Sequence, residues 1–451
     1  MPKDPIHPKK RNAEGVMESP RQLSVRDHYD VIVCGGGPAG VGAALAAARE
    51  GARTLVIEQY GMLGGVWTAG LLNPFFECGG RGWVVDDLVN RLTQEGAFRK
   101  WRAHDYCFDI ESMRRILEQM LTEAGADLLY YTRIADSIIE DDKICGVVIE
   151  SKAGRQAVMA EVVIDTTGDG DVLARSGCEY NLGRESDGHL QPMTLMFEVR
   201  GLPHDYEQES SQVLYDQMMQ AIKTHSLAYE LPYPRCGYAP WIMGTPSPGV
   251  GDVQSTHVFR MNPLDPADLT RGTIDCRQQA AETVEILKRI PGFEQVELTH
   301  TASQIGIREA RRLVGRYSME LQDLIEGRRF EDAVTSCGFV IDVHHEEAAG
   351  KEVEMVHTRI KPYEIPYRSL IPQELRGLLV AGRCISGSHE AHASYRVTGT
   401  AMALGQAAGL AAARAVREKI ELVDVDGRAL RATLQQRGAK FADDVKVVHQ
   451  S

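Results

Sequence analysis

Residues 29–40 read Y-D-V-I-V-C-G-G-G-P-A-G, and this stretch decides the fold. Its first half, 29–34, is a short apolar run rich in β-branched residues, which is typical of a parallel strand buried on both faces. An Ala-rich stretch follows and stops at Gly51, the type of residue that commonly ends a helix. Residues 53–58 form a second apolar run. The sequence therefore predicts a β-strand, an α-helix and a second β-strand in a parallel sheet.

The glycines between the first strand and the helix suit a bound dinucleotide. Gly35 permits a tight turn, Gly37 lets the backbone approach a pyrophosphate, and Gly40 lets helix and strand pack closely. Backbone N–H groups at the helix start face the phosphate charge. Glu58 ends the second strand, where an acid accepts hydrogen bonds from the adenosine ribose. The alternative interpretation is a glycine-rich turn without a ligand. The predicted contacts are Gly35, Gly37, Pro38, Ala39, Gly40 and Glu58.

A second segment favours FAD over NAD. Residues 127–171 read as extended strands with a hairpin-like turn at 140–143, and they end in V-V-I-D-T-T-G-D-G-D. This pattern resembles the strand and turn that follow the adenosine site in flavoproteins with two dinucleotide-binding domains. The resemblance implies that a Thr-Gly turn, here Thr167 and Gly168, passes near the adenine and pyrophosphate of FAD.

A third segment lies near the other end of the chain. Residues 377–383 read G-L-L-V-A-G-R, and an Ala- and Gly-rich helical stretch follows at 399–409. The pattern resembles the C-terminal flavin motif of the same superfamily, in which a helix N-terminus points at the isoalloxazine ring. The helix dipole would there stabilise negative charge on the reduced flavin. An ordinary packing helix is the alternative. The resemblance implies FAD contacts at Gly382, Arg383, Gly399 and Thr400.

Several further stretches resemble one family of FAD-dependent oxidoreductases, distantly similar to the fumarate reductase and succinate dehydrogenase flavoproteins. The resemblance covers most of the chain after residue 28 and implies that Gly64 and Gly65 also approach FAD. The chain departs from the usual pattern at Cys34 and at 337–340, and the second departure changes the expected pocket wall. The matching stretches are 63–71, 191–197, 306–317, 341–344, 366–372 and 381–391.

A chain of 451 residues is longer than one hydrophobic core usually supports. We expect an α/β fold in which a Rossmann-like FAD-binding domain with a parallel sheet is discontinuous in sequence. An inserted α+β substrate domain interrupts it. The expected parts are a flexible N-terminal arm at 1–28, the FAD-binding domain at 29–183 and 369–422, the inserted domain at 184–368, and a helix and tail at 423–451.

Within these parts the periodicity predicts individual elements. Helices are expected over 83–92 and 270–289, and another after Asp109, a plausible N-cap. Residues 255–260 resemble a strand, and Pro-rich loops are expected around 231–251.

Composition and charge limit the partners. Fifty basic and 63 acidic residues give a net charge of −13, which opposes a general grip on nucleic acid. The nine cysteines are scattered without a CxxC pair, so a disulfide framework and a metal centre are poorly supported. No apolar run spans a membrane, and no signal-peptide core follows the basic N-terminal run. We expect a cytoplasmic protein with a small-molecule substrate, no metal and no membrane partner; a homo-oligomer stays open.

The predicted catalytic residues are His389, Arg396 and His344. His389, His392 and Arg396 precede the flavin-facing helix, where a histidine could move a proton and an arginine could orient an anion. The alternative for these three is flavin binding or helix capping. Asp342 and His344 are two apart, so they would share one face of a strand. A structural Asp–His pair is at least as well supported.

Two other groups carry weaker signals. Arg308, Glu309, Arg311 and Arg312 have helical spacing, which permits binding of a substrate carboxylate but favours an ion-pair network. Cys78 has no visible redox partner and is interpreted as pocket lining at most.

These observations predict an enzyme, an FAD-dependent oxidoreductase that transfers a hydride between the flavin and a small polar organic substrate. Dehydrogenase, oxidase and reductase activities are all compatible with the motifs. The alternatives are a flavoprotein acting in RNA modification, a flavin monooxygenase and a non-catalytic flavin-binding partner in an assembly. The acidic balance counts against the first alternative.

Overall fold

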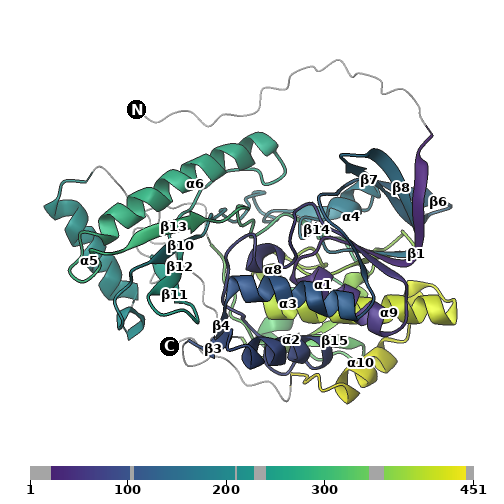
Figure 1. The fold of residues 1–451 in the computed structure, drawn as a ribbon. Coiled ribbons are helices and arrows are strands. Elements are labelled where there is room, and N and C mark those ends of the chain that lie inside the picture. Colours follow the sequence, from purple (N-terminus) through teal and green to yellow (C-terminus); the bar gives the residue numbers. More distant parts are fainter. Residues whose placement is uncertain (1–21, 102–105, 209–210, 228–239, 345–359, 443–451) are drawn as a thin grey trace.

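The computed structural model describes residues 22–101, 106–208, 211–227, 240–344 and 360–442 (Figure 1). Most of the expected N-terminal arm, the end of the C-terminal tail and most of the first half of the 231–251 loop region lie outside the described residues. No helix in these ranges is both long and apolar enough to cross a membrane.

The larger unit of the molecule is built around a central sheet with the strand order β5-β2-β1-β8-β7-β6. Strand β1 (Ser24–Cys34) pairs in parallel with β2 (Thr54–Ile57) and with β8 (Gly154–Asp165). β5 (Asp127–Leu129) extends the parallel sheet beyond β2, and β17 (Leu378–Val380) pairs in parallel with the end of β8. The C-terminal part of the chain thus completes the N-terminal sheet, so the domain is discontinuous as expected.

The first half of β8 pairs antiparallel with β7 (Lys143–Ser151), whereas its end pairs with β17. Strand β7 forms a hairpin with β6 (Arg133–Glu140). Asp141 and Asp142 adopt positive φ angles of 46° and 59° in the connecting turn. The predicted hairpin at 140–143 is confirmed.

Strand β1 begins earlier than expected. Residues 24–28 were assigned to the flexible arm, but Ser24 already pairs with Gln156 of β8. The side chains of this stretch are mostly exposed, so they are polar and show no apolar strand pattern in the sequence.

Two helices pack closely beneath the sheet. α1 (Pro38–Arg49) lies against α9 (Thr398–Glu418) (Figure 1). Small residues line their contact. A Cβ atom on Gly405 would lie 1.9 Å from the Ala39 carbonyl oxygen, and one on Gly409 would lie 2.0 Å from that of Ala43. Glycine is therefore required at both positions.

Further helices cover the same core. α2 (Trp83–Gln94) and α3 (Ile110–Glu123) are amphipathic, and their apolar faces join the main hydrophobic cluster. The Asp109 side chain accepts a hydrogen bond from the Ser112 amide at 2.8 Å, which confirms the predicted N-cap. α10 (Gly427–Gln436) is the expected C-terminal helix.

The second unit is an antiparallel sheet with the strand order β11-β12-β10-β13, covered by two helices (Figure 1). Its core contains apolar residues from the sheet and from both helices, so it is the expected α+β unit. Its elements are β10 (Phe197–Arg200), α5 (Ser211–Thr224), β11 (Trp241–Gly244), β12 (Val250–Gln254), α6 (Pro266–Leu287) and β13 (Glu297–Thr301).

Part of the segment 184–368, expected as the inserted domain, packs with the main core. Residues such as Met319, Tyr363 and Tyr367 belong to the main cluster with α1 and α9. We propose that the inserted unit ends before these residues. Shorter elements complete the fold: β3 (Phe98–Lys100), β4 (Tyr106–Phe108), α4 (Asp171–Arg175), β9 (Tyr180–Leu182), β14 (Arg311–Leu313), α7 (Leu321–Glu326), β15 (Ala333–Cys337), β16 (Tyr363–Pro366) and α8 (His389–Tyr395).

Two local predictions are wrong. Residues 308–312 form no helix, because Arg311–Leu313 is the strand β14, which pairs with β9. Residues 255–260 form no strand. The backbone leaves the sheet after Gln254, and the His257 amide instead donates to the Gln279 side chain at 2.9 Å.

Candidate active site

A cavity runs along the carboxyl ends of the parallel strands, the place where open α/β sheets bind ligands. It extends from the β2 end, past the β1–α1 turn and the turn after β8, to the start of α9. Residues of the second unit, including Trp241 of β11 and Gln254 of β12, close its far end. The cavity therefore lies between the two units.

The β1–α1 turn forms a cradle of backbone atoms. Gly35 has a φ of 103°, and a Cβ atom there would lie 2.7 Å from the Thr166 carbonyl oxygen. A Cβ on Gly40 would lie 1.8 Å from the Gly35 carbonyl oxygen. A Cβ on Gly37, in contrast, would meet no atom within 4 Å, and no side chain caps the N-terminus of α1. An anionic group can thus approach the backbone at Gly37.

Glu58 fixes this turn from the neighbouring strand. Its carboxylate accepts hydrogen bonds from the Gly36 amide at 2.7 Å and from the Tyr60 amide at 2.8 Å. Burial raises the pKa of Glu58. Each carboxylate oxygen keeps a second lone pair, so Glu58, which lines the cavity, can still accept from a ribose hydroxyl.

The turn after β8 and the loop after β17 meet at the middle of the cavity. Arg383 pairs with Asp169 at 2.8 Å and donates to the Ile307 carbonyl oxygen at 2.6 Å. Gly168 lies directly against this guanidinium group, since a Cβ atom there would be 2.6 Å from Arg383 Nη2. Thr167 and Gly382 line the same stretch.

The start of α9 leaves polar groups without partners. Thr398 Oγ1 is buried and has no hydrogen-bond partner within the described ranges, and Thr398 lines the cavity. The side chain of the N-cap residue Val397 cannot accept a hydrogen bond, so no side chain caps the first turn of α9. A ligand with an acceptor atom would satisfy the Thr398 hydroxyl at this end of the cavity.

Four of the predicted FAD contacts lie behind the cavity surface. Gly399 donates its amide to the Phe76 carbonyl oxygen at 3.0 Å, and a Cβ atom there would lie 2.3 Å from the same oxygen. Gly399 thus serves close packing in the structure. Gly40, Gly64 and Thr400 also lie outside the lining, whereas Gly65 lines it.

The far end of the cavity contains a cluster of charged side chains. Arg396 donates to Asp342 Oδ2 at 2.8 Å, and His344 Nε2 lies 3.2 Å from the same oxygen. Burial opposes ionisation of Asp342, but the adjacent His344 and Arg396 outweigh it and lower the pKa. Burial and the nearby Arg308 lower the pKa of His344 to about 4. His344 is therefore neutral at pH 7.

Sequence analysis missed one member of this cluster, His257. The Arg308 guanidinium group contacts His257 Nε2 at 3.3 Å, and the His257 and His344 rings are stacked with centroids 5.9 Å apart. Burial lowers the pKa of His257. Arg308 also donates to the Pro192 carbonyl oxygen at 2.6 Å and to Thr194 Oγ1 at 2.7 Å. No motif surrounds His257, so only its place in the fold reveals it.

A family model described as "FAD dependent oxidoreductase" matches residues 30–434. The chain belongs to this family. Thiamine thiazole synthase of Aeropyrum pernix is 32% identical over 185 residues, covering 38% of this chain and 66% of the relative. Digeranylgeranylglycerophospholipid reductase 2 of Methanococcoides burtonii is 31% identical over 160 residues, covering 32% and 39%. The chain thus spans less than two thirds of the length of these curated relatives.

Two solved structures are similar to this chain at low sequence identity. A geranylgeranyl bacteriochlorophyll reductase-like protein from Thermoplasma acidophilum superposes with a TM-score of 0.47 at 14% identity, covering 92% of this chain and 84% of that one. THI4 of Thermovibrio ammonificans gives a TM-score of 0.29 at 22% identity, covering 35% and 67%.

Membership in the FAD-dependent oxidoreductase family gives this protein FAD as its cofactor. The residues fit that cofactor, because the open backbone at Gly37 accommodates a pyrophosphate and the unpartnered Thr398 hydroxyl faces the predicted flavin end. In this family member, Glu58 would hold the adenosine ribose, and Thr167, Gly168 and Arg383 would flank the middle of FAD.

The predicted catalytic residues divide into two groups. Arg396 and His344 line the cavity, but His389 does not. Its Nδ1 atom lies 2.9 Å from a carboxylate oxygen of Glu309, which also pairs with Arg312. His392 is buried outside the lining as well. The expected ion-pair network of Glu309 and Arg312 is present, although it forms on an extended segment.

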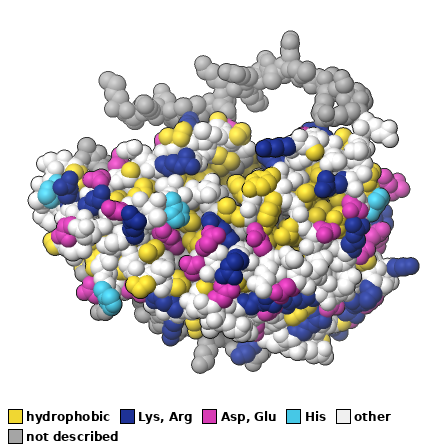
Figure 2. Space-filling model, in the orientation of Figure 1, with side chains coloured by type: hydrophobic (Ala, Val, Ile, Leu, Met, Phe, Trp, Pro, Cys, Tyr) yellow, Lys and Arg dark blue, Asp and Glu magenta, His cyan; other side chains and the backbone are white. Residues whose placement is uncertain are grey.

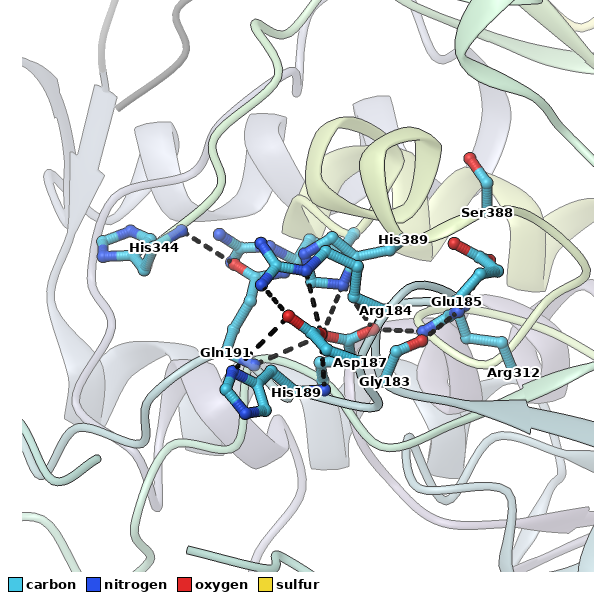
Figure 3. Close-up of polar contacts among 12 residues, drawn as sticks. Gly183, Arg184, Glu185, Asp187, His189, Gln191, Arg312, His344, Ser388 and His389 are labelled. Atoms are coloured by element: carbon cyan, nitrogen blue, oxygen red, sulfur yellow. Dashed lines mark hydrogen bonds and ion pairs between the residues drawn. The ribbon is translucent and has the colours of Figure 1, made fainter. Parts of the chain in front are cut away.

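The buried pair nevertheless connects to the cavity. The Gln191 amide donates to Glu309 at 3.3 Å. The Gln191 side-chain oxygen accepts from the His344 amide at 3.2 Å (Figure 3). Gln191 therefore links the Glu309–His389 pair to the backbone of His344. No group of three or more metal-ligating side chains suited to a metal ion occurs in the described part of the chain.

Proposed function

We propose that this protein transfers a hydride between FAD and a small polar organic substrate, and that the Asp342–His344 pair exchanges the accompanying proton. FAD, when bound, supplies the two-electron redox chemistry. The observation that carries the proposal is that Asp342, His344 and Arg396 contact one another and line the same cavity as Thr398. Arg396 precedes Thr398 by two residues, so the charged cluster adjoins the start of α9.

The hydrogen bond between His344 and Asp342 supports a role in proton transfer. If Nε2 donates to the Asp342 carboxylate, the neutral ring keeps its lone pair on Nδ1, which can accept a proton from a substrate hydroxyl or amine. Asp342 would orient the ring and stabilise the positive charge formed on it. In the reducing direction, the same nitrogen would return the proton.

Polar groups on the surrounding wall support a polar substrate. Gln304 lines the cavity, and its Oε1 atom is buried without a hydrogen-bond partner in the described part of the chain. Gln254 and Thr194 line the same end. A substrate with a hydroxyl or amino group would satisfy the unpaired acceptor.

Two features support the proposed partners and location. On the face seen in Figure 2, Lys and Arg side chains lie among Asp and Glu side chains, which offers no broad basic area for nucleic acid. The eight cysteines of the described ranges form no disulfide, which is compatible with a reducing cytoplasm.

Visible spectroscopy of the purified holoenzyme under anaerobic conditions tests the proposal. Polyols, hydroxy acids, amines and NAD(P)H are added in turn, and bleaching of the flavin bands is recorded. We expect bleaching by an organic donor, and we expect His344→Gln to slow it while FAD stays bound. Bleaching by NAD(P)H alone would favour the monooxygenase alternative. A holoenzyme that no donor reduces, and that no acceptor reoxidises after chemical reduction, would overturn the proposed function.

A further inference from the structure

The ion pair between Glu77 and Arg81 is buried behind the wall of the cavity. Arg81 Nη2 lies 2.6 Å from Glu77 Oε2, and the Arg81 and Glu77 side chains are only 2% and 5% exposed. Both residues lie outside the cavity lining. A buried ion pair often stabilises a fold no better than apolar side chains of similar volume would. Stability alone therefore does not explain this pair, and its contacts indicate a role in geometry.

The loop that carries the pair, residues 76–82, has an unusual backbone. Glu77 has a φ of 56°, in the left-handed region that residues other than glycine seldom adopt. Such a conformation persists only where the surroundings fix it, and it is common near functional sites. Arg81 supplies this restraint, because its Nε atom donates to the Glu77 carbonyl oxygen at 2.6 Å.

Glu77 connects the two segments that carry the aromatic residues Phe76 and Phe339. Glu77 Oε2 accepts a hydrogen bond from the Gly338 amide at 3.2 Å. Phe76 directly precedes Glu77, and Phe339 directly follows Gly338. Both rings line the cavity, and their centroids are 5.5 Å apart. One buried carboxylate therefore fixes the spacing of two rings that face the ligand.

Arg81 connects the same loop to β15 and to α9. Its Nη1 atom donates to Thr335 Oγ1 at 3.1 Å and to the Ser336 carbonyl oxygen, both at the end of β15. Its Nη2 atom donates to Thr400 Oγ1 at 3.4 Å, in the first turn of α9. The Arg81 carbonyl oxygen accepts from Gln406 Nε2 at 3.2 Å, further along α9. The guanidinium group thus joins three separate segments.

The start of α9 lies directly on the loop 76–82. The Gly399 amide donates to the Phe76 carbonyl oxygen at 3.0 Å. A Cβ atom on Gly399 would lie 2.5 Å from the Glu77 carbonyl oxygen. Thr398, the preceding residue, lines the cavity. Because the backbones are in close contact, a change in this loop changes the position of the first turn of α9.

We propose that Glu77 and Arg81 are positioning residues, which hold Phe76, Phe339 and the start of α9 in place around the flavin. Both side chains act from behind the cavity wall and contact neither FAD nor substrate. The inference rests on the part of the proposed function that sets the flavin beside the start of α9. It does not depend on which substrate the enzyme takes.

The proposal has a consequence for the midpoint potential of bound FAD. The N-terminus of a helix carries partial positive charge, which stabilises the negative charge of a reduced flavin beside it. Without the ion pair, the start of α9 is held less firmly, so we expect reduced FAD to lose more affinity than oxidised FAD. Weaker binding of the reduced form lowers the potential of this two-electron couple.

Substitution of both partners separates position from charge. Glu77→Gln combined with Arg81→Met removes one charge of each sign, so the net charge behind the cavity is unchanged. We expect the midpoint potential to fall by about 30 mV, which corresponds to about tenfold weaker binding of reduced relative to oxidised FAD. Anaerobic reduction of the holoenzyme in equilibrium with a dye of known potential measures it. FAD content and urea unfolding are recorded for each variant.

Two further variants support the measurement. Arg81→Lys keeps the positive charge but cannot contact Glu77, Thr335 and Thr400 together, so it tests the inference even if the double variant does not fold. We expect it to lower the potential by about 15 mV, or about threefold in relative affinity. Arg414→Met combined with Glu418→Gln removes an ion pair near the other end of α9 and should leave the potential unchanged.

The outcomes separate the two proposals. Variants that lose unfolding free energy but keep the potential of the parent would show that the pair serves stability alone, which overturns the inference. A raised potential would overturn it as well. If the potential falls but no donor ever reduces the flavin of the parent, the positioning role stands and the hydride-transfer function fails. If a donor reduces the parent and the variants keep its potential, the reverse holds.

Discussion

His389 Nδ1 lies 2.9 Å from a carboxylate oxygen of Glu309, and both side chains are buried outside the cavity lining. The same carboxylate pairs with Arg312, which is also fully buried and donates to the Gly183 and Gly387 carbonyl oxygens. This arrangement connects the loop before α8, at Gly387, with Gly183 after β9 and with the segment before β14 that contains Glu309. It supports a structural role for His389, which the sequence predicts to be catalytic.

Removing the charge of Glu309 should destabilise the fold. In Glu309→Gln the buried Arg312 guanidinium group loses its buried carboxylate and keeps, among the described residues, only the exposed Glu185, at 3.5 Å. Breaking a buried ion pair typically costs about 3–5 kcal/mol. Denaturant unfolding measures the change in the free energy of unfolding. His389→Asn should cost less and should leave anaerobic flavin reduction within about threefold of the parent. A folded, FAD-loaded His389→Asn protein that no donor reduces would return His389 to a catalytic role.

Substitution at the Asp342–His344 pair should act on rate rather than on cofactor binding. We expect His344→Gln to slow flavin reduction about 10²- to 10⁴-fold, the usual contribution of a positioned general base. Stopped-flow reduction under anaerobic conditions measures it, and the flavin-to-protein absorbance ratio controls for FAD loss. A rate unchanged by the substitution would remove proton transfer from His344.

The lowered pKa of His344 makes a prediction for stability. Its pKa of about 4 in the folded protein lies below the ordinary value of 6.5. As the pH falls below 6.5, the unfolded chain therefore takes up this proton first, and the fold loses stability until the pH approaches 4. Between pH 7 and pH 5 we expect the unfolding free energy of the parent to fall more than that of His344→Gln, by at most about 2 kcal/mol. Parallel losses in the two proteins would contradict the pKa shift.

The helix contact beneath the cofactor should be intolerant of side chains. Gly405→Ala would place a Cβ atom 1.9 Å from the Ala39 carbonyl oxygen, which forces α9 away from α1. We expect a loss of about 1–3 kcal/mol in unfolding free energy and weaker FAD retention. Gly79→Ala is the matched control, because its Cβ atom would meet nothing within 4 Å. Equal behaviour of the two variants would show that the close contact is not required.

Gly37→Ala should separate cofactor binding from folding. The added methyl group would meet no protein atom within 4 Å, so the fold should keep its stability. The methyl group would occupy space that we assign to the FAD pyrophosphate, and we expect the Kd for FAD to rise about tenfold. Reconstitution of the apoprotein, followed by the flavin spectrum, measures that constant. An unchanged Kd would place the pyrophosphate elsewhere.

The sequence by itself determined the features that depend on neighbouring residues. The β1–α1 unit, the hairpin at 140–143 and the N-cap Asp109 were predicted because turns, caps and strand patterns depend on short-range chemistry. The glycine spacing likewise indicated a dinucleotide, and the resemblance of the later motifs to known flavoproteins indicated FAD. The start of β1 at Ser24 was missed because its pairing partner lies more than a hundred residues away.

The tertiary structure alone decided which polar residues meet in the cavity. Arg308 and Glu309 are adjacent in sequence and have helical spacing with Arg312, yet they lie outside any helix. Arg308 lines the cavity and contacts His257, whereas Glu309 contacts the buried His389. Contacts between residues so distant in sequence depend on how the two units pack, and no local pattern records that packing.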